Sequence, residues 1–266
     1  MTSFQALVLG LIQGLTEFLP VSSSAHLALA PWFFGWKDPG LAFDVALHFG
    51  TLIAVLWYFR SEWAKLIAAA ISMIRARRVE TVEERRVIFL ILATIPGAIG
   101  GLLLEKKAET AFRAPALTAT ALIVMGIVLW AADRFSRMNR ELPAMRWLDA
   151  FLIGVSQVFA LIPGVSRSGS TITTGRLLSF DRQSAAVFSF LMSMPIIAAA
   201  VVLKGSEAMR GGVTAPLIIG VAAAAVSSWL AISILLRYVT RHSYGIFALY
   251  RVILGVVVLV VLYVRG

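Results

Sequence analysis

The chain has 266 residues, of which 59% are hydrophobic and 14% charged, and its mean hydropathy is +0.87. Globular domains are about 45–50% apolar and about 25% charged, so this composition excludes a water-soluble fold. At about 20 residues per crossing, the apolar residues suffice for about eight membrane spans and leave little for a soluble domain. We attribute the net charge of +10 to basic loops beside an anionic leaflet and not to nucleic-acid binding.

Eight apolar segments are predicted, six long enough to cross a bilayer and two shorter. In chain order they are a short segment at 4–19, spans at 41–59, 87–104 and 114–132, a short segment at 147–162, and spans at 183–203, 213–236 and 243–264. Each short segment has 16 residues, so as a helix it covers about 24 Å of a hydrocarbon core of about 30 Å.

Both short segments run into a break that is rich in proline, glycine and serine. The breaks lie at 20–24 and 163–168, and a second short helix follows each of them. Proline and glycine end a helix, and serine caps the next one. Each segment is therefore predicted to form a helix–break–helix hairpin that enters and leaves the membrane on the same side.

The two breaks are also an internal repeat. A shift of 144 residues superimposes identical residues: Gln13 and Gln157, Val21 and Val165, Ser22 and Ser166, and Ser24 and Ser168. Each half, 1–140 and 141–266, then has one hairpin and three full spans, and because three is odd the second half inserts upside down. We expect one all-α membrane domain, 1–266, with an inverted-topology repeat, in which paired interrupted segments mark the binding site.

Lysine and arginine predict the orientation of the chain. The segments 60–86, 134–146 and 237–241 carry 13 of these residues, and the alternate loops and termini carry 7. The basic side is expected to face the cytoplasm. The first hairpin then enters from outside and the second from the cytoplasm, so that their tips meet near the middle of the membrane. The basic run at 75–86 is interpreted as a solvated loop.

The first hairpin carries a carboxylate and a serine cluster. Gln13 and Glu17 are four residues apart on one helix face, and an intramembrane carboxylate is a functional candidate. The residues that open the second short helix are Ser22, Ser23, Ser24 and His26. Free N–H groups at a helix start favour an anion. Two simpler interpretations remain, in which the serines only cap the helix and Glu17 only pairs with a hydroxyl or with Arg167.

The second hairpin offers an arginine among hydroxyls. Its candidate ligands are Ser166, Arg167, Ser168 and Thr171. The planar fork of arginine matches phosphate oxygens in pairs, so we predict an anion site, with phosphate favoured. The alternative is a buried Arg167–Glu17 pair that holds the two hairpins together.

Three other charged or titratable residues lie in the spans. Asp44 and His48 are four residues apart, and we expect them to have a packing or supporting role. Arg251 lies about one turn inside its span, and we expect it to extend outward to the interface. Together these patterns indicate phosphate chemistry in a membrane cavity that a lipid-borne phosphate reaches laterally.

At these motifs the sequence resembles a known family. The stretch 13–26 (QGLTEFLPVSSSAH) is similar to the first signature of the bacterial undecaprenyl-diphosphatases, the bacitracin-resistance proteins, and 163–171 (PGVSRSGST) is similar to the second. The segments 41–60 and 184–195 are similar as well, so the resemblance covers essentially the whole chain. Many members have glutamate where Gln13 stands, and this departure removes one carboxylate from any cation site.

The resemblance implies a function and a location. The expected reaction is hydrolysis of undecaprenyl diphosphate to undecaprenyl phosphate and phosphate, which recycles the lipid carrier for peptidoglycan synthesis and confers bacitracin resistance. The expected location is the bacterial cytoplasmic membrane, with the site open to the periplasm. The expected partners are the polyprenyl diphosphate substrate and membrane lipids, without nucleic acid.

A mechanism that fits both the residue patterns and the family resemblance leaves the identity of the nucleophile open. Arg167 and the N–H groups at the breaks would hold the diphosphate, to which the hydroxyls of both hairpins would also donate: Ser22, Ser24, Ser166, Ser168 and Thr171. Ser23 or a water would attack the terminal phosphorus with His26 as the base. Alternatively, His26 would be the nucleophile. Glu17 would orient His26 or, with Gln13, hold a divalent cation such as Mg²⁺ or Ca²⁺, and no organic cofactor is expected. The rival function is a lipid-phosphate transporter on the same inverted-repeat fold.

Overall fold

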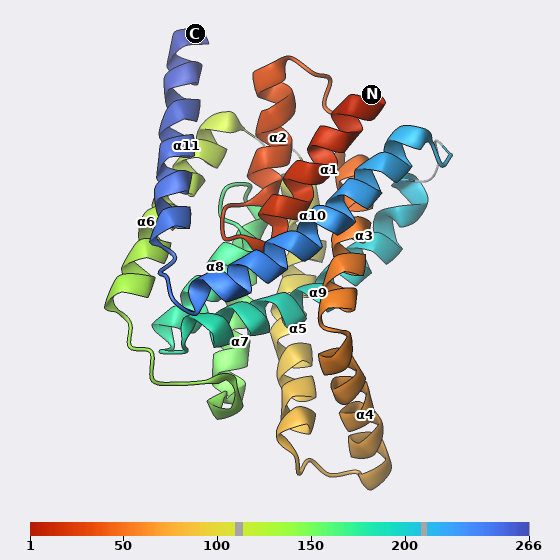
Figure 1. The fold of residues 1–266 in the computed structure, drawn as a ribbon, viewed down its shortest axis with the longest axis vertical. Coiled ribbons are helices and arrows are strands. Elements are labelled where there is room, and N and C mark those ends of the chain that lie inside the picture. The colour runs from red at the N-terminus through yellow and green to blue at the C-terminus, as the bar shows by residue number, and fades with distance from the viewer. Residues whose placement is uncertain (110–113, 209–211, 266) are drawn as a thin grey trace.

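The computed structural model describes residues 1–109, 114–208 and 212–265, which are almost entirely helical (Figure 1). Its helices are α1 (Ser3–Phe18), α2 (Ser23–Phe34), α3 (Leu41–Tyr58), α4 (Arg60–Ala76), α5 (Val82–Glu109), α6 (Pro115–Phe135), η2 (Leu142–Ala144), α7 (Trp147–Ser156), η3 (Gln157–Leu161), α8 (Arg167–Leu177), α9 (Arg182–Ala208), α10 (Ala215–Val239) and α11 (Gly245–Arg265). The predicted all-α class is confirmed, and helices flank both predicted breaks, as α1–α2 and α7–η3–α8. That each pair enters and leaves the membrane on the same side stays a prediction.

Five of the described helices are long and apolar enough to cross a membrane, and they match five of the six predicted spans. They are α5, α6, α9, α10 and α11. The sixth, α3, meets the criterion only together with α4, from which it is bent by 80°. The chain is therefore a multi-pass membrane protein, whereas the upside-down insertion of its second half stays a prediction.

The sequence analysis assigned no helix to residues 60–76, which form α4, and the basic run at 75–86, interpreted as a solvated loop, is a turn only over 77–81. Leu66 and Ala69 are buried in this helix, and Trp63 and Leu66 line an apolar groove shared with α5. The basic residues of this segment hid that apolar stripe, because a charged side chain on the outer helix face does not prevent burial of the inner one. α4 ends at Ala76, and the residue that caps it, Arg77, has a φ of 53°.

The helix α1 packs closely against α10, and glycine makes this approach possible. A side chain at Gly14 would collide with the Ser227 hydroxyl and with the carbonyl oxygen of Ala224. Figure 1 shows α10 running diagonally across the front of the bundle beside α1. The close contact fixes the depth and rotation of α1, and with them the position of its polar residues.

A buried ion cluster anchors the end of α8 that lies away from the break. Arg176 is fully buried, and its Nε lies 2.9 Å from Oδ1 of Asp133 on α6. Arg182 at the start of α9 reaches the same oxygen at 2.8 Å, and the backbone N–H of Tyr244 donates to Oδ2 at 2.9 Å. One aspartate thus joins α6, α8, α9 and the link between α10 and α11.

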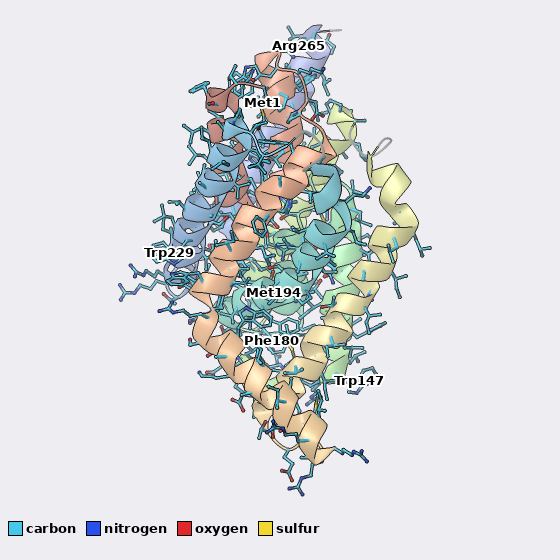
Figure 2. The ribbon with its side chains drawn as sticks, turned by 90° about the vertical axis from the view of Figure 1, so that its right-hand side faces the viewer. Met1, Trp147, Phe180, Met194, Trp229 and Arg265 are labelled. Carbon is cyan, nitrogen blue, oxygen red and sulfur yellow. The ribbon has the colours of Figure 1, made fainter. Side chains whose placement is uncertain are left out.

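The loops predicted to share one side of the membrane lie away from the chain termini. The α4–α5 turn and the link from α6 to α7 are at the opposite end of the molecule from both termini (Figure 1). Figure 2 shows the same arrangement from the side, with Met1 and Arg265 together at one end. This placement agrees with the grouping of the basic loops, and their cytoplasmic location stays a prediction.

Candidate active site

The first break turns the chain sharply before α2. α1 ends at Phe18, Pro20 follows, and Ser22 caps α2 with its Oγ accepting from the N–H of Ala25 at 3.4 Å. The backbone of Ser22 has a φ of 76°, a conformation that costs free energy in a residue with a Cβ. This turn directs the next side chain, Ser23, back toward α1.

The second break has the same local geometry as the first. Ser166 has a φ of 74°, and its Oγ accepts from the N–H of Gly169 at 3.0 Å. The hydroxyl oxygens of Ser22 and Ser24 are 3.2 Å apart, and those of Ser166 and Ser168 are also 3.2 Å apart. The two breaks therefore share one local conformation, as the shift of 144 residues predicts.

The tips of the two hairpins touch, as the sequence predicts. The N–H of Gly164 donates to Oγ of Ser22 at 3.0 Å, and Oγ of Ser168 donates to the carbonyl oxygen of Leu19 at 3.0 Å. Each contact satisfies a backbone group that a broken helix leaves without an intrahelical partner. Chain segments about 145 residues apart thus form one structural unit.

The prediction that Arg251 extends outward is wrong. Its side chain is fully buried and donates to the carbonyl oxygens of Pro20 at 3.1 Å, Gly164 at 2.7 Å and Val165 at 2.9 Å. Carbonyl groups at both breaks have no helical partner, and a guanidinium with five N–H donors satisfies several at once. Arg251 therefore holds both breaks from α11.

Glu17 lies at the centre of the polar residues that the two hairpins bring together. Its Oε1 accepts from Arg167 at 2.8 Å, and its Oε2 accepts from Oγ of Ser23 at 2.5 Å and from Nε2 of Gln13 at 3.0 Å. Nε2 of His48 on α3 lies 3.5 Å from Oε2. The Arg167–Glu17 pair, which the sequence analysis gave only as the alternative to an anion site, is present, and it leaves Oε2 directed at the Ser23 hydroxyl.

A cavity of about 240 Å³ opens beside these groups. Its polar wall is formed by Glu17, Ser23, Ser24, His48, Gln157, Ser166 and Arg167, and its apolar wall includes Leu161, Ile196, Ile197 and Ala200. A polar patch facing an apolar wall suits a ligand that combines an anionic head with a hydrocarbon chain. A hydroxyl on a carboxylate, next to an arginine, is an arrangement suited to phosphoryl transfer.

Comparison with known proteins identifies the family. Residues 6–257 match the family model described as "Bacitracin resistance protein BacA". The chain belongs to this family. It is 66% identical over 259 residues to an undecaprenyl-diphosphatase of Gemmatimonas aurantiaca, with 97% of each chain covered. It is 51% identical over 265 residues to an undecaprenyl-diphosphatase of Moorella thermoacetica, with both chains covered completely.

In this BacA-family chain, His26 does not face Ser23 or Glu17 as the sequence analysis expects. Its Nδ1 lies 2.7 Å from the carbonyl oxygen of Ser22, and its Nε2 lies 2.7 Å from the hydroxyl of Tyr250 on α11. Both ring nitrogens therefore have partners away from the cavity, whose described lining does not include His26. In this geometry the carboxylate that contacts the Ser23 hydroxyl is Glu17.

Three of the predicted phosphate ligands use their hydroxyls within the protein. Ser22 bonds to the opposite hairpin, as does Ser168, and Thr171 Oγ1 lies 2.7 Å from Oγ of Ser189. All three are buried outside the described lining of the cavity. Ser24 and Ser166 do line the cavity, so they are the hydroxyls that remain candidates for phosphate binding.

Two polar residues of the cavity wall, His48 and Gln157, were not assigned to the site from the sequence. His48 was expected only to pack or to support, and Gln157 was noted only as the repeat partner of Gln13. The amide nitrogen of Gln157 donates to the carbonyl oxygen of Ala93 at 2.7 Å. The Oε1 atoms of Gln157 and Gln13 are both buried and have no hydrogen-bond partner within the described residues. The repeat itself was the signal that pointed to Gln157.

Proposed function

We propose that this chain hydrolyses undecaprenyl diphosphate to undecaprenyl phosphate and inorganic phosphate in the bacterial cytoplasmic membrane. One observation carries the proposal: Oγ of Ser23 lies 2.5 Å from Oε2 of Glu17 in a cavity that Arg167 also lines. These three side chains supply a nucleophile, a base and a fixed cation. The undecaprenyl-diphosphatase names of the relatives and the apolar wall of the cavity support a lipid diphosphate as the substrate.

In the first step, Oγ of Ser23 attacks the terminal phosphorus while its proton passes to Oε2 of Glu17. The bond from that phosphorus to the bridging oxygen breaks, and undecaprenyl phosphate leaves with the electron pair and takes the proton from Glu17. The Arg167 guanidinium stabilises the charge on the phosphoryl oxygens during this transfer. The product on the protein is a phosphoserine at Ser23.

In the second step, water attacks the phosphoserine, and Glu17 accepts a proton from that water. The bond from phosphorus to Oγ breaks, the serine oxygen takes the proton back from Glu17, and inorganic phosphate leaves. Glu17 thus acts as base and then as acid in each step. A direct attack by water on the diphosphate would give the same products without a phosphoserine, so trapping this intermediate separates the two routes.

A divalent cation stays a prediction for this site. Among the residues described as lining the cavity, Glu17 is the one carboxylate. Its oxygens already contact Arg167, Ser23, Gln13 and His48. The described residues contain no cluster of three His, Cys, Asp or Glu that could hold a metal. The partnerless Oε1 of Gln13 is an oxygen donor of the kind that Mg²⁺ and Ca²⁺ accept, with substrate phosphates completing the shell. A cation held there would neutralise phosphate charge, and no step above passes through it.

The deciding experiment is phosphate release from a long-chain prenyl diphosphate by detergent-purified protein. We expect release by the wild type and a loss of roughly 1,000-fold in Ser23→Ala and in Glu17→Gln, because each removes one half of the nucleophile–base pair. An acid-quenched phosphoserine at Ser23 would establish the two-step route. Absence of release by the wild type, together with transbilayer movement of the lipid in liposomes, would replace the enzyme with the transporter.

A further inference from the structure

His48 is the one cationic or titratable side chain from outside the two hairpins that lines the described cavity. It lies on α3. On the same helix, Leu47 just before it and Thr51 one turn after it are fully buried. Thr51 also donates from Oγ1 to the carbonyl oxygen of His48 at 2.8 Å. The backbone that carries this imidazole therefore belongs to a well-packed helix.

The partners of the two ring nitrogens fix how the imidazole is turned. Nδ1 lies 2.7 Å from the carbonyl oxygen of Asp44, and that oxygen only accepts hydrogen bonds. Nδ1 therefore carries a hydrogen. Nε2 is then directed toward Oε2 of Glu17, at 3.5 Å. This oxygen is also an acceptor, so a favourable contact requires a hydrogen on Nε2 as well.

The position of Oε2 needs such a contact, because Arg167 competes for it. An arginine fork prefers to bind both oxygens of a carboxylate, and here Arg167 reaches only Oε1, at 2.8 Å. Its other terminal nitrogen donates to the carbonyl oxygen of Ser189 at 3.2 Å. Gln13 and His48 are on the Oε2 side, where they oppose rotation of the carboxylate toward the guanidinium.

We propose that His48 is a positioning residue, which keeps Oε2 of Glu17 against the Ser23 hydroxyl through Nε2 while Nδ1 is anchored to the backbone at Asp44. The inference rests on the proposed function, since it assigns His48 to the same nucleophile–base pair. Its contribution is to the rate of attack by Ser23 and not to the affinity for the lipid.

The test compares His48→Gln with His48→Asn. The glutamine amide nitrogen can take the place of Nε2 and reach Glu17, whereas the asparagine amide is at the place of Nδ1 and reaches only the Asp44 carbonyl. We expect His48→Asn to lower kcat for prenyl diphosphate hydrolysis by about 30-fold with KM changed less than about threefold. We expect His48→Gln to stay within about threefold of wild type. His242→Asn, at an exposed histidine in the α10–α11 link, is the control and keeps wild-type kinetics.

A second measurement reports on Ser23 directly. The rate at which a fluorophosphonate probe labels Ser23, located by mass spectrometry, should fall in His48→Asn by the same factor as kcat. Retention of kcat and labelling by both variants, a larger loss in His48→Gln than in His48→Asn, or equal losses in both would overturn the inference. A wild type that releases phosphate without labelling at Ser23 would also overturn it, while a wild type that releases no phosphate overturns the proposed function itself.

Discussion

At the scale of single residues, the two oxygens of Glu17 have different partners and so different tasks. Oε1 is held by the cation of Arg167, and Oε2 accepts the Ser23 hydroxyl. A carboxylate with both oxygens bound by arginine would be a poor proton acceptor, because the guanidinium stabilises its charge. The split arrangement fixes Glu17 in place, and in the proposed mechanism it leaves Oε2 to accept the Ser23 proton.

Arg167→Lys tests whether the arginine fork matters beyond its charge. Lysine keeps the charge but cannot bind Glu17 and the Ser189 carbonyl from two fixed nitrogens. We expect kcat/KM for prenyl diphosphate hydrolysis to fall by about 100-fold. Arg134→Lys, at an exposed position at the end of α6, is the matched control and should keep wild-type activity. Equal activity in the two variants would show that any cation suffices at residue 167.

At the scale of elements, the two broken hairpins depend on a third helix. The breaks leave carbonyl groups without helical partners, and α11 supplies Arg251 to bind those of Pro20, Gly164 and Val165. In a membrane interior water is not present to satisfy such groups, so their partner must come from the protein. α11 is therefore part of the site although none of its residues lines the described cavity.

Arg251→Met tests this dependence. Methionine retains much of the volume but leaves three buried carbonyls without their donor, so we expect the free energy of unfolding to fall by about 3 kcal/mol. Thermal unfolding of the detergent-purified variant measures the loss. Arg265→Met, at the exposed end of the same helix, removes a surface hydrogen bond to the Trp32 carbonyl and a contact with the Trp32 ring, and it should change the midpoint of thermal unfolding little. Similar midpoints for both variants would contradict the role assigned to Arg251.

At the scale of the whole molecule, the predicted orientation of the loops would set the compartment from which the head group of the proposed substrate enters. The α2–α3 link and the α4–α5 turn are separated by the length of α3 and α4 (Figure 1). The lysine and arginine counts assign the second of these to the cytoplasm. The first hairpin, which carries Ser23 and Glu17, would then enter from the periplasmic side.

Single cysteines test this orientation, since the chain contains none of its own. Lys37→Cys lies in the α2–α3 link and Arg78→Cys in the α4–α5 turn, and both positions are exposed. We expect a membrane-impermeant maleimide added to intact cells to label the cysteine at 37 and to label the cysteine at 78 only after permeabilisation. The opposite pattern would invert the assigned orientation.

The sequence by itself determined the membrane class, the two breaks and most of the helices, although not α4. Composition required a membrane protein, proline and glycine ended the two short helices, and the intramembrane Glu17 and Arg167 had to find partners. These are local properties, because a helix ends or a charge is isolated for reasons present in its own segment. The repeat also fixed the shared conformation of the two breaks.

Only the tertiary structure decided which faces meet. The spacing of Asp44 and His48 places them on one face of α3, but the packing of α3 brings that face to Glu17. His26 is close to Ser23 along the chain, yet its ring turns to Tyr250 on α11. Arg251 is near the end of its span, and the hairpin tips beside it provide the carbonyls that keep it inside. Each outcome depends on contacts between segments far apart in the chain, which no local pattern encodes.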